Sequence, residues 1–137
     1  MARPASLLTF VEVDGVVDLR AAEFHVSAWH GAVLDDGRRV TLLDDRGWGG
    51  KINRGEIWPH LDREQIENEA RFVVGPDEAF GDHTQEDMAR DHWAHLAGVL
   101  GAQGVEIEAA ELRRLPHEVA LGERLLAALE AGRDLRS

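Results

Sequence analysis

Two alternating strand patterns joined by a turn signal dominate the first third of the sequence. In residues 24–34 every even-numbered position is apolar except His30, and alternation with a period of two is typical of a half-buried strand. Val40 and Leu42 supply the apolar positions of the second pattern. The sequence therefore predicts an antiparallel hairpin over residues 22–45.

The length of the turn is set by the face on which the apolar side chains must lie. A two-residue turn at residues 36–37 would pair Val33 with Val40 and put the apolar side chains of the second strand on the wrong face. A three-residue loop of residues 35–37 pairs Ala32 with Val40 instead. Its last residue is a glycine, which suits the left-handed conformation that such a loop needs. The pattern predicts the three-residue loop.

Further strands and helices are predicted along the chain. Residues 6–13 are rich in strand-forming residues. Capping residues at Asp62 and Thr84 begin helices over residues 62–74 and 84–102, and leucines at helical spacing indicate a last helix over residues 122–131 that Gly132 ends. The other predicted segments are short strands at residues 16–17, 105–108 and 117–121, a helical turn at 111–115 and a long loop over 46–59.

Length and composition fit one α+β domain over residues 1–137, with an N-terminal antiparallel sheet packed against the helices. The chain has no cysteine, which excludes disulfides and thiolate metal sites. No apolar run approaches the roughly 20 residues that cross a bilayer. The acids Glu12 and Asp14 follow the first apolar run at once, unlike a signal peptide. We expect a cytoplasmic protein.

The net charge of −11 is concentrated in one part of the chain. Residues 62–91 hold ten acids and three bases, whereas residues 38–54 hold five bases and two acids. Such a field argues against a nucleic-acid binder and favours a basic partner. The alternative is that the acids only keep the protein soluble and complement helix dipoles.

Three acids fit the alternative poorly, because Asp77, Glu78 and Asp82 lie in a loop between the two central helices and not in a first helical turn. They could meet Arg and Lys side chains of a partner and orient it. Aromatic residues often anchor such interfaces. The predicted partner-binding residues are Asp77, Glu78, Asp82, Glu67, Trp48 and Trp58.

The histidines offer a second interpretation, an enzyme or a small-molecule or metal-binding protein. His92 and His95 are three residues apart on one predicted helix and with His30 could line a metal site. His92 also lies in an apolar stripe, where a core histidine serves equally well. No nucleophile elbow, P-loop or metalloprotease motif is present. We expect neither catalysis nor a cofactor.

Four segments resemble the layout of small α+β immunity proteins from bacterial contact-dependent inhibition and other polymorphic toxin systems. The segments are VTLLDDRGWG (residues 40–49), VVGPDEAFGD (residues 73–82), the pair His92-Trp93 and LPHEV (residues 115–119). The resemblance implies a cytoplasmic inhibitor without catalysis that binds one cognate toxin domain, often a basic nuclease. Neither nucleic acid nor a membrane is an expected partner, and monomer and homodimer both remain open.

Overall fold

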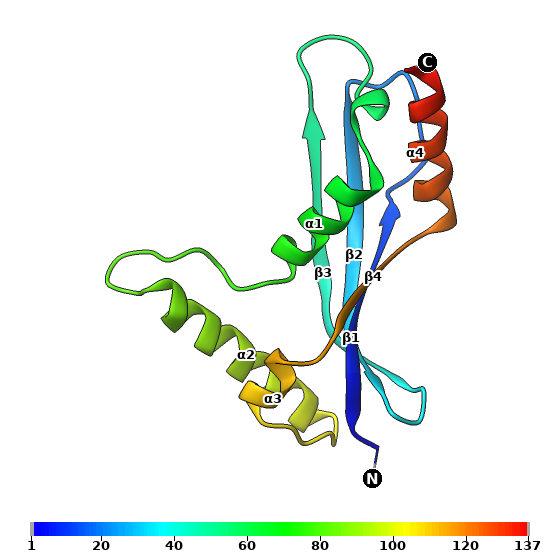
Figure 1. Cartoon of the computed structure of the whole chain (residues 1–137). Helices are drawn as coiled ribbons and strands as arrows, with labels where there is room; N and C mark the ends of the chain where they lie inside the picture. The colour runs from blue at the N-terminus through cyan, green and yellow to red at the C-terminus, as the bar shows by residue number, and fades with distance from the viewer. Residues whose placement is uncertain (1, 137) are drawn as a thin grey trace. The chain divides into compact units, whose positions relative to one another are not determined.

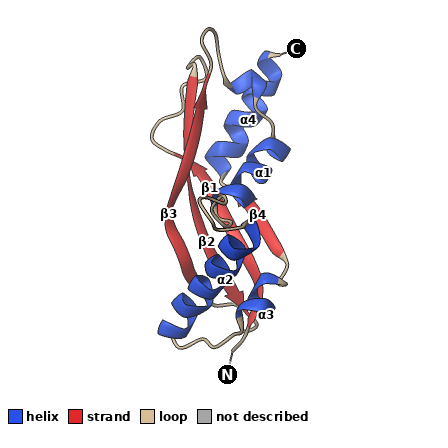
Figure 2. Cartoon of the chain, turned by 90° about the vertical axis from the view of Figure 1, so that its left-hand side faces the viewer, coloured by secondary structure: helices blue, strands red, loops and turns tan. Residues whose placement is uncertain are grey.

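The computed structural model describes residues 2–136, and its elements form an α+β fold, as predicted (Figures 1 and 2). The elements in chain order are β1 (Pro4–Val13), β2 (Glu23–Leu34), β3 (Arg39–Lys51), η1 (Trp58–His60), α1 (Arg63–Val73), α2 (Gln85–Ala102), α3 (Ala109–Arg113), β4 (His117–Leu121) and α4 (Glu123–Leu135). None of the helices in the described part of the chain is long and apolar enough to cross a membrane.

The four strands form one sheet in the order β3-β2-β1-β4. The strands β1, β2 and β3 are antiparallel neighbours, which confirms the predicted N-terminal sheet. β4 runs parallel to β1, since the Leu7 amide donates to the Pro116 carbonyl and, further along both strands, the Gly122 amide donates to the Val11 carbonyl. The sheet is therefore mixed, with β4 as a parallel edge strand.

The turn between β2 and β3 is the predicted three-residue loop. The Leu34 amide donates to the Arg38 carbonyl at 2.8 Å, which closes the loop around residues 35–37. Gly37 has a φ of +88°, a conformation that side chains other than glycine rarely adopt. The apolar residues Phe24, Val26 and Ala28 consequently all lie on the buried side of β2.

The predicted loop over residues 46–59 is wrong at its start, because β3 continues to Lys51. The glycines that suggested a loop lie in the strand, where they let it approach β2 closely. A Cβ atom on Gly47 would lie 2.8 Å from the Val26 carbonyl oxygen, and one on Gly49 would collide with the Phe24 carbonyl oxygen. Glycine in a strand can mark such a close backbone approach.

The contacts group the residues into two compact units, each with its own hydrophobic core. Unit 1 comprises residues 1–8, 30–44 and 74–118, and unit 2 comprises residues 9–29, 45–73 and 119–137. In unit 1 the helix α2 contributes Leu96 and Leu100 to the core. In unit 2 the residues Trp58, Ile66 and Leu125 bring η1, α1 and α4 together with the strands.

Three other segments differ from prediction. Residues 16–17 and 105–108 are not strands, since Val16 is 95% exposed and the Val105 amide donates to the Leu100 carbonyl at the end of α2 and not to a strand. The last helix does not stop at Gly132 but continues to Leu135. Gly132 is buried against η1, where an added Cβ would lie 2.5 Å from the Trp58 carbonyl oxygen. This glycine therefore permits close packing and does not end the helix.

We predict that Gly132→Ala destabilises the protein by about 2–4 kcal/mol, because backbone atoms of η1 cannot move away cheaply. The matched control is Gly98→Ala in α2, where an added Cβ would meet nothing within 4 Å and should stabilise by about 0.5–1 kcal/mol. Urea unfolding of both variants measures the difference. If the two substitutions changed the free energy of unfolding equally, the close contact between α4 and η1 would be contradicted.

Candidate acidic binding surface

The loop that carries the predicted acidic site is tied to the start of α2 by the side chain of Gln85. Its Oε1 accepts a hydrogen bond from the Ala79 amide at 3.2 Å, and its Nε2 donates to the Asp77 carbonyl at 3.3 Å. The His83 amide also donates to the Phe80 carbonyl at 3.0 Å. These bonds attach residues 77 and 79 to the start of α2 and close a turn at residues 80–83.

A capping box begins α2 directly after this loop, as predicted. The Thr84 hydroxyl accepts from the Asp87 amide, and the Asp87 carboxylate accepts from the Thr84 amide, both at 3.1 Å. Hydrogen bonds from Thr84, the backbone bond foremost, hold the pKa of Asp87 below its ordinary value. Asp87 therefore stays ionised and serves the helix itself.

Between residues 62 and 91, the acids that form hydrogen bonds or ion pairs within the chain lie mostly in or beside helices. Asp62 accepts from the Gln65 amide at 2.8 Å, and Glu86 pairs with Arg113 at 3.0 Å. Within residues 2–136 no ion pair or side-chain hydrogen bond involves the carboxylates of Asp77, Glu78 or Asp82, and all three residues are exposed. Internal structure accounts for the first group and leaves these three acids available to a partner.

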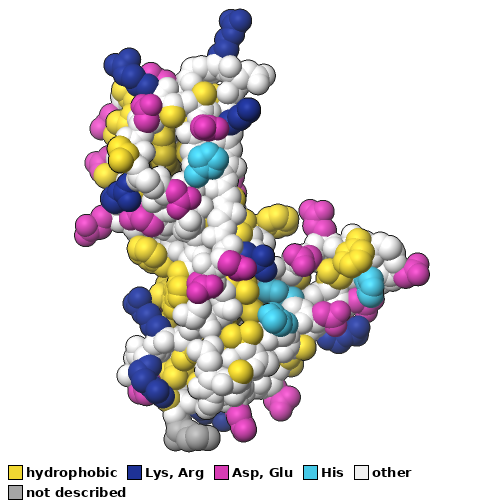
Figure 3. Space-filling view, turned by 180° about the vertical axis from the view of Figure 1, so that it is seen from behind, with side chains coloured by type: hydrophobic (Ala, Val, Ile, Leu, Met, Phe, Trp, Pro, Cys, Tyr) yellow, Lys and Arg dark blue, Asp and Glu magenta, His cyan; other side chains and the backbone are white. Residues whose placement is uncertain are grey.

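An exposed aromatic side chain stands among these acids. Phe80 is 62% exposed, and its ring centroid lies 5.1 Å from that of His83. Figure 3 shows hydrophobic, histidine and acidic side chains together around this loop. We call Asp77, Glu78, Phe80 and Asp82 the acidic surface. It combines an apolar centre with charged neighbours, the usual anatomy of a protein interface.

The other predicted partner-binding residues have internal roles. Trp58 is 3% exposed and packs in the core of unit 2, with its ring 5.9 Å from that of Phe24, so it is corrected from a surface anchor to a core residue. Glu67 pairs with Arg63 at 2.8 Å along α1. Neither Glu67 nor the two tryptophans belong to the unit that carries the acidic surface.

Trp48 is half-buried and joins β3 to α1. Its indole Nε1 donates to Glu69 Oε2 at 2.7 Å, and Gln65 Nε2 donates to the other oxygen of the same carboxylate at 3.2 Å. A hydrogen bond to a charged acceptor is one of the stronger kinds in proteins. Trp48 therefore contributes to the stability of unit 2.

We predict that Trp48→Phe lowers the free energy of unfolding by about 1.5–3 kcal/mol, because the aromatic ring remains but the donor to Glu69 is lost. A double-mutant cycle with Glu69→Leu isolates the pair. If the two substitutions were strictly additive, the bond would have no energetic weight and Trp48 would again be a candidate for partner contact.

Three histidines come together in unit 1, although not the three that were predicted. His30 is 1% exposed, its ring centroid is 5.2 Å from that of His117, and it also interacts electrostatically with His92. His95 is exposed on α2. Among residues 2–136 no group of three or more His, Asp or Glu side chains is arranged to hold a metal ion.

Burial is the main cause of a lowered pKa at His30, followed by the charges of His117 and His92, and together they bring that pKa to about 3. His30 is consequently neutral in the folded protein at neutral pH. In the unfolded chain its pKa returns to about 6.5. Between about pH 3 and pH 6.5, the unfolded chain therefore binds more protons at this residue than the folded protein does.

We predict that the stability contributed by His30 is fully present above pH 6.5 and is lost as the pH falls from 6.5 to about 3. The slope should reach at most about 1.4 kcal/mol per pH unit. Urea unfolding at several pH values, compared with His30→Gln, separates this effect from the acids that both proteins share. Parallel pH profiles for the two proteins would contradict it.

Sequence reasoning missed Phe80 and Gln85, and it did not predict that His117 lies beside His30. Phe80 carries a readable signal, since a large apolar residue in a loop of glycine, proline and acids has no core to fill. The role of Gln85 depends on the backbone path of the preceding loop. His117 approaches His30 only because β4 joins the sheet beside β1, a pairing that local patterns do not specify.

Comparison with protein-family models, with curated proteins and with solved structures finds no match for this chain.

Proposed function

We propose that this chain is a non-catalytic cytoplasmic protein that binds a basic protein through the acidic surface, and that the partner is a cognate toxin domain which it neutralises. The observation that carries the proposal is the division of labour among the acids. Most of those in and beside the helices (Asp62, Glu67, Glu69, Glu86 and Asp87) cap a helix or bind a neighbouring side chain. The three on the loop have no internal partner in residues 2–136 and lie beside the exposed Phe80; the helix acids Glu64 and Asp91 are the only others of this stretch without one in the described residues.

The hydrogen bonds that attach the loop to α2 support binding. A segment that is already held by Gln85 and by the bond between His83 and Phe80 loses less conformational entropy when a partner docks. Phe80 would enter an apolar pocket of the partner, and the three carboxylates would pair with surrounding Arg or Lys side chains. Such pairs add orientation and speed of association to the apolar contact.

The negative net charge of the chain supports a positively charged partner. At −11, the chain attracts basic proteins over a distance of about one Debye length, roughly 8 Å at physiological salt. A toxin domain that acts on nucleic acid is basic at its active site, because it must bind phosphates. An acidic surface that covers such a site would block the substrate without any chemistry of its own.

The proposal predicts that the gene immediately upstream encodes the toxin, and the test uses the C-terminal domain of that gene's product; an upstream gene of unrelated metabolic type would contradict the proposal. We predict that the triple reversal D77K/E78K/D82K weakens the complex at least about 100-fold and that Phe80→Ala weakens it at least about 30-fold. Isothermal titration calorimetry of the purified proteins measures both. A toxin assay in cells should show loss of protection in the same variants.

The matched control is E106K/E118K/D134K, which changes the net charge by the same amount at three exposed acids that form no ion pair within the described residues. Its affinity should fall only a few-fold. Equal losses for the two triple variants would mean that only overall charge matters. Unchanged affinity in D77K/E78K/D82K would remove the acidic surface from the interface.

A further inference from the structure

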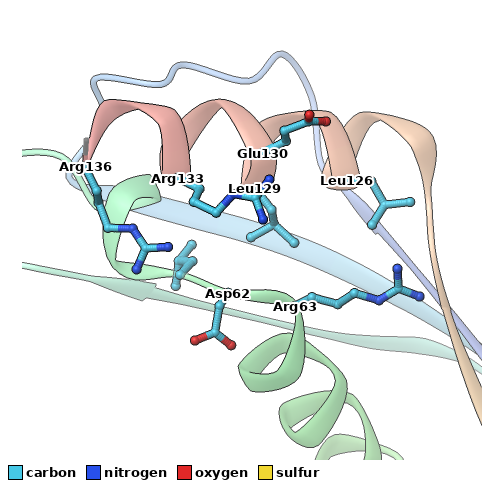
Figure 4. Close-up of a pocket in the computed structure, with 8 residues that line it drawn as sticks. Asp62, Arg63, Leu126, Leu129, Glu130, Arg133 and Arg136 are labelled. Atoms are coloured by element: carbon cyan, nitrogen blue, oxygen red, sulfur yellow. The ribbon is translucent and has the colours of Figure 1, made fainter.

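A second candidate binding site lies in unit 2, in a cavity of about 420 Å³ between the start of α1 and the side of α4 that faces it (Figure 4). Its apolar wall is formed by Leu61, Leu126 and Leu129. Its polar wall includes Arg63, Arg133 and Arg136. The volume lies within the usual range for small-ligand sites.

Two of the arginines, Arg133 and Arg136, line the cavity together, although the chain as a whole has more acids than bases. Leu126, Leu129, Arg133 and Arg136 follow one another at spacings of three and four residues, which places them on one face of α4. Figure 4 shows the side chains of Arg133 and Arg136 directed toward the same side as Leu129. The face therefore changes from apolar to cationic along the cavity.

The two acids at the cavity form no ion pair with these arginines within residues 2–136. Asp62 Oδ1 accepts from the Gln65 amide at 2.8 Å, and the Glu130 carboxylate points away from α1 in Figure 4. Arg63 pairs with Glu67, but Arg133 and Arg136 form no ion pair within residues 2–136. Two like charges on one helix face repel each other unless an anion lies between them.

We propose that this cavity binds a small organic carboxylate with a hydrocarbon chain. The guanidinium groups of Arg133 and Arg136 hold the carboxylate, to which their planar donors are matched. Leu61, which follows η1, and the two leucines of α4 enclose the chain and remove its apolar surface from water. This site is separate from the acidic surface and does not depend on the proposed function.

The probe is sodium octanoate, added to the full chain labelled with ¹⁵N and followed by two-dimensional NMR. We predict saturable shifts confined to residues 61–63 and 126–136. Two further probes separate the parts of the ligand, since 1-octanol has the chain without the charge and sodium acetate has the charge without the chain. Each should bind at least about 10-fold more weakly than octanoate, because it loses one of the two contacts.

The variant R133M/R136M keeps the apolar stems and removes the charges, and it should weaken octanoate binding at least about 10-fold. The control R39M/R71M removes two other exposed arginines without ion pairs in the described residues and should bind within about two-fold of the original protein. Octanol binding as tight as octanoate, unsaturable shifts, or unaltered affinity in R133M/R136M would each overturn the proposal. The comparison of probes on the unaltered protein decides the matter even if the variant unfolds.

Discussion

The pairing register of the β2–β3 hairpin is the constraint on which the two hydrophobic cores depend. Phe24, Val26 and Ala28 of β2 are buried in one core, and Ala32 and Leu34 of the same strand are buried in the other. A slip by one residue would turn the apolar side chains of β3, Val40 and Leu42, to the face opposite these five, at about 1.5–3 kcal/mol for each large side chain. That cost favours the three-residue loop, in which Gly37 adopts a positive φ of +88° without the strain that a side chain would add.

The sequence predicted those features that depend on local pattern. The hairpin, the capping box of Thr84 and Asp87 and the strand at residues 117–121 all rest on neighbours along the chain, and the structure confirms them. The errors arise where backbones from distant segments meet. Gly47, Gly49 and Gly132 read as breaks in the sequence, but they mark close approaches inside β3 and α4.

The predictions for the candidate site were likewise right where they depended on local pattern and wrong where they depended on contacts between distant segments. Exposure of Asp77, Glu78 and Asp82 follows from their position in a glycine- and proline-containing loop, and the structure agrees with it. The roles of the aromatic residues were not predictable from their type alone. Trp58 fills the core of unit 2, Trp48 binds Glu69, and the aromatic side chain left exposed beside the acids is Phe80. Residue type favoured the tryptophans, but contacts between distant segments decided which ring stays accessible.

In the proposed binding mode the partner covers the loop of residues 77–83 and does not change the conformation of the rest of the fold. Amide hydrogen exchange, measured on the free chain and on its complex with the proposed basic partner, tests this most directly. We predict slower exchange in the complex over residues 77–91 and little change in β1, β3 and α4. Protection centred on those other elements, with unchanged exchange at residues 77–91, would contradict the account.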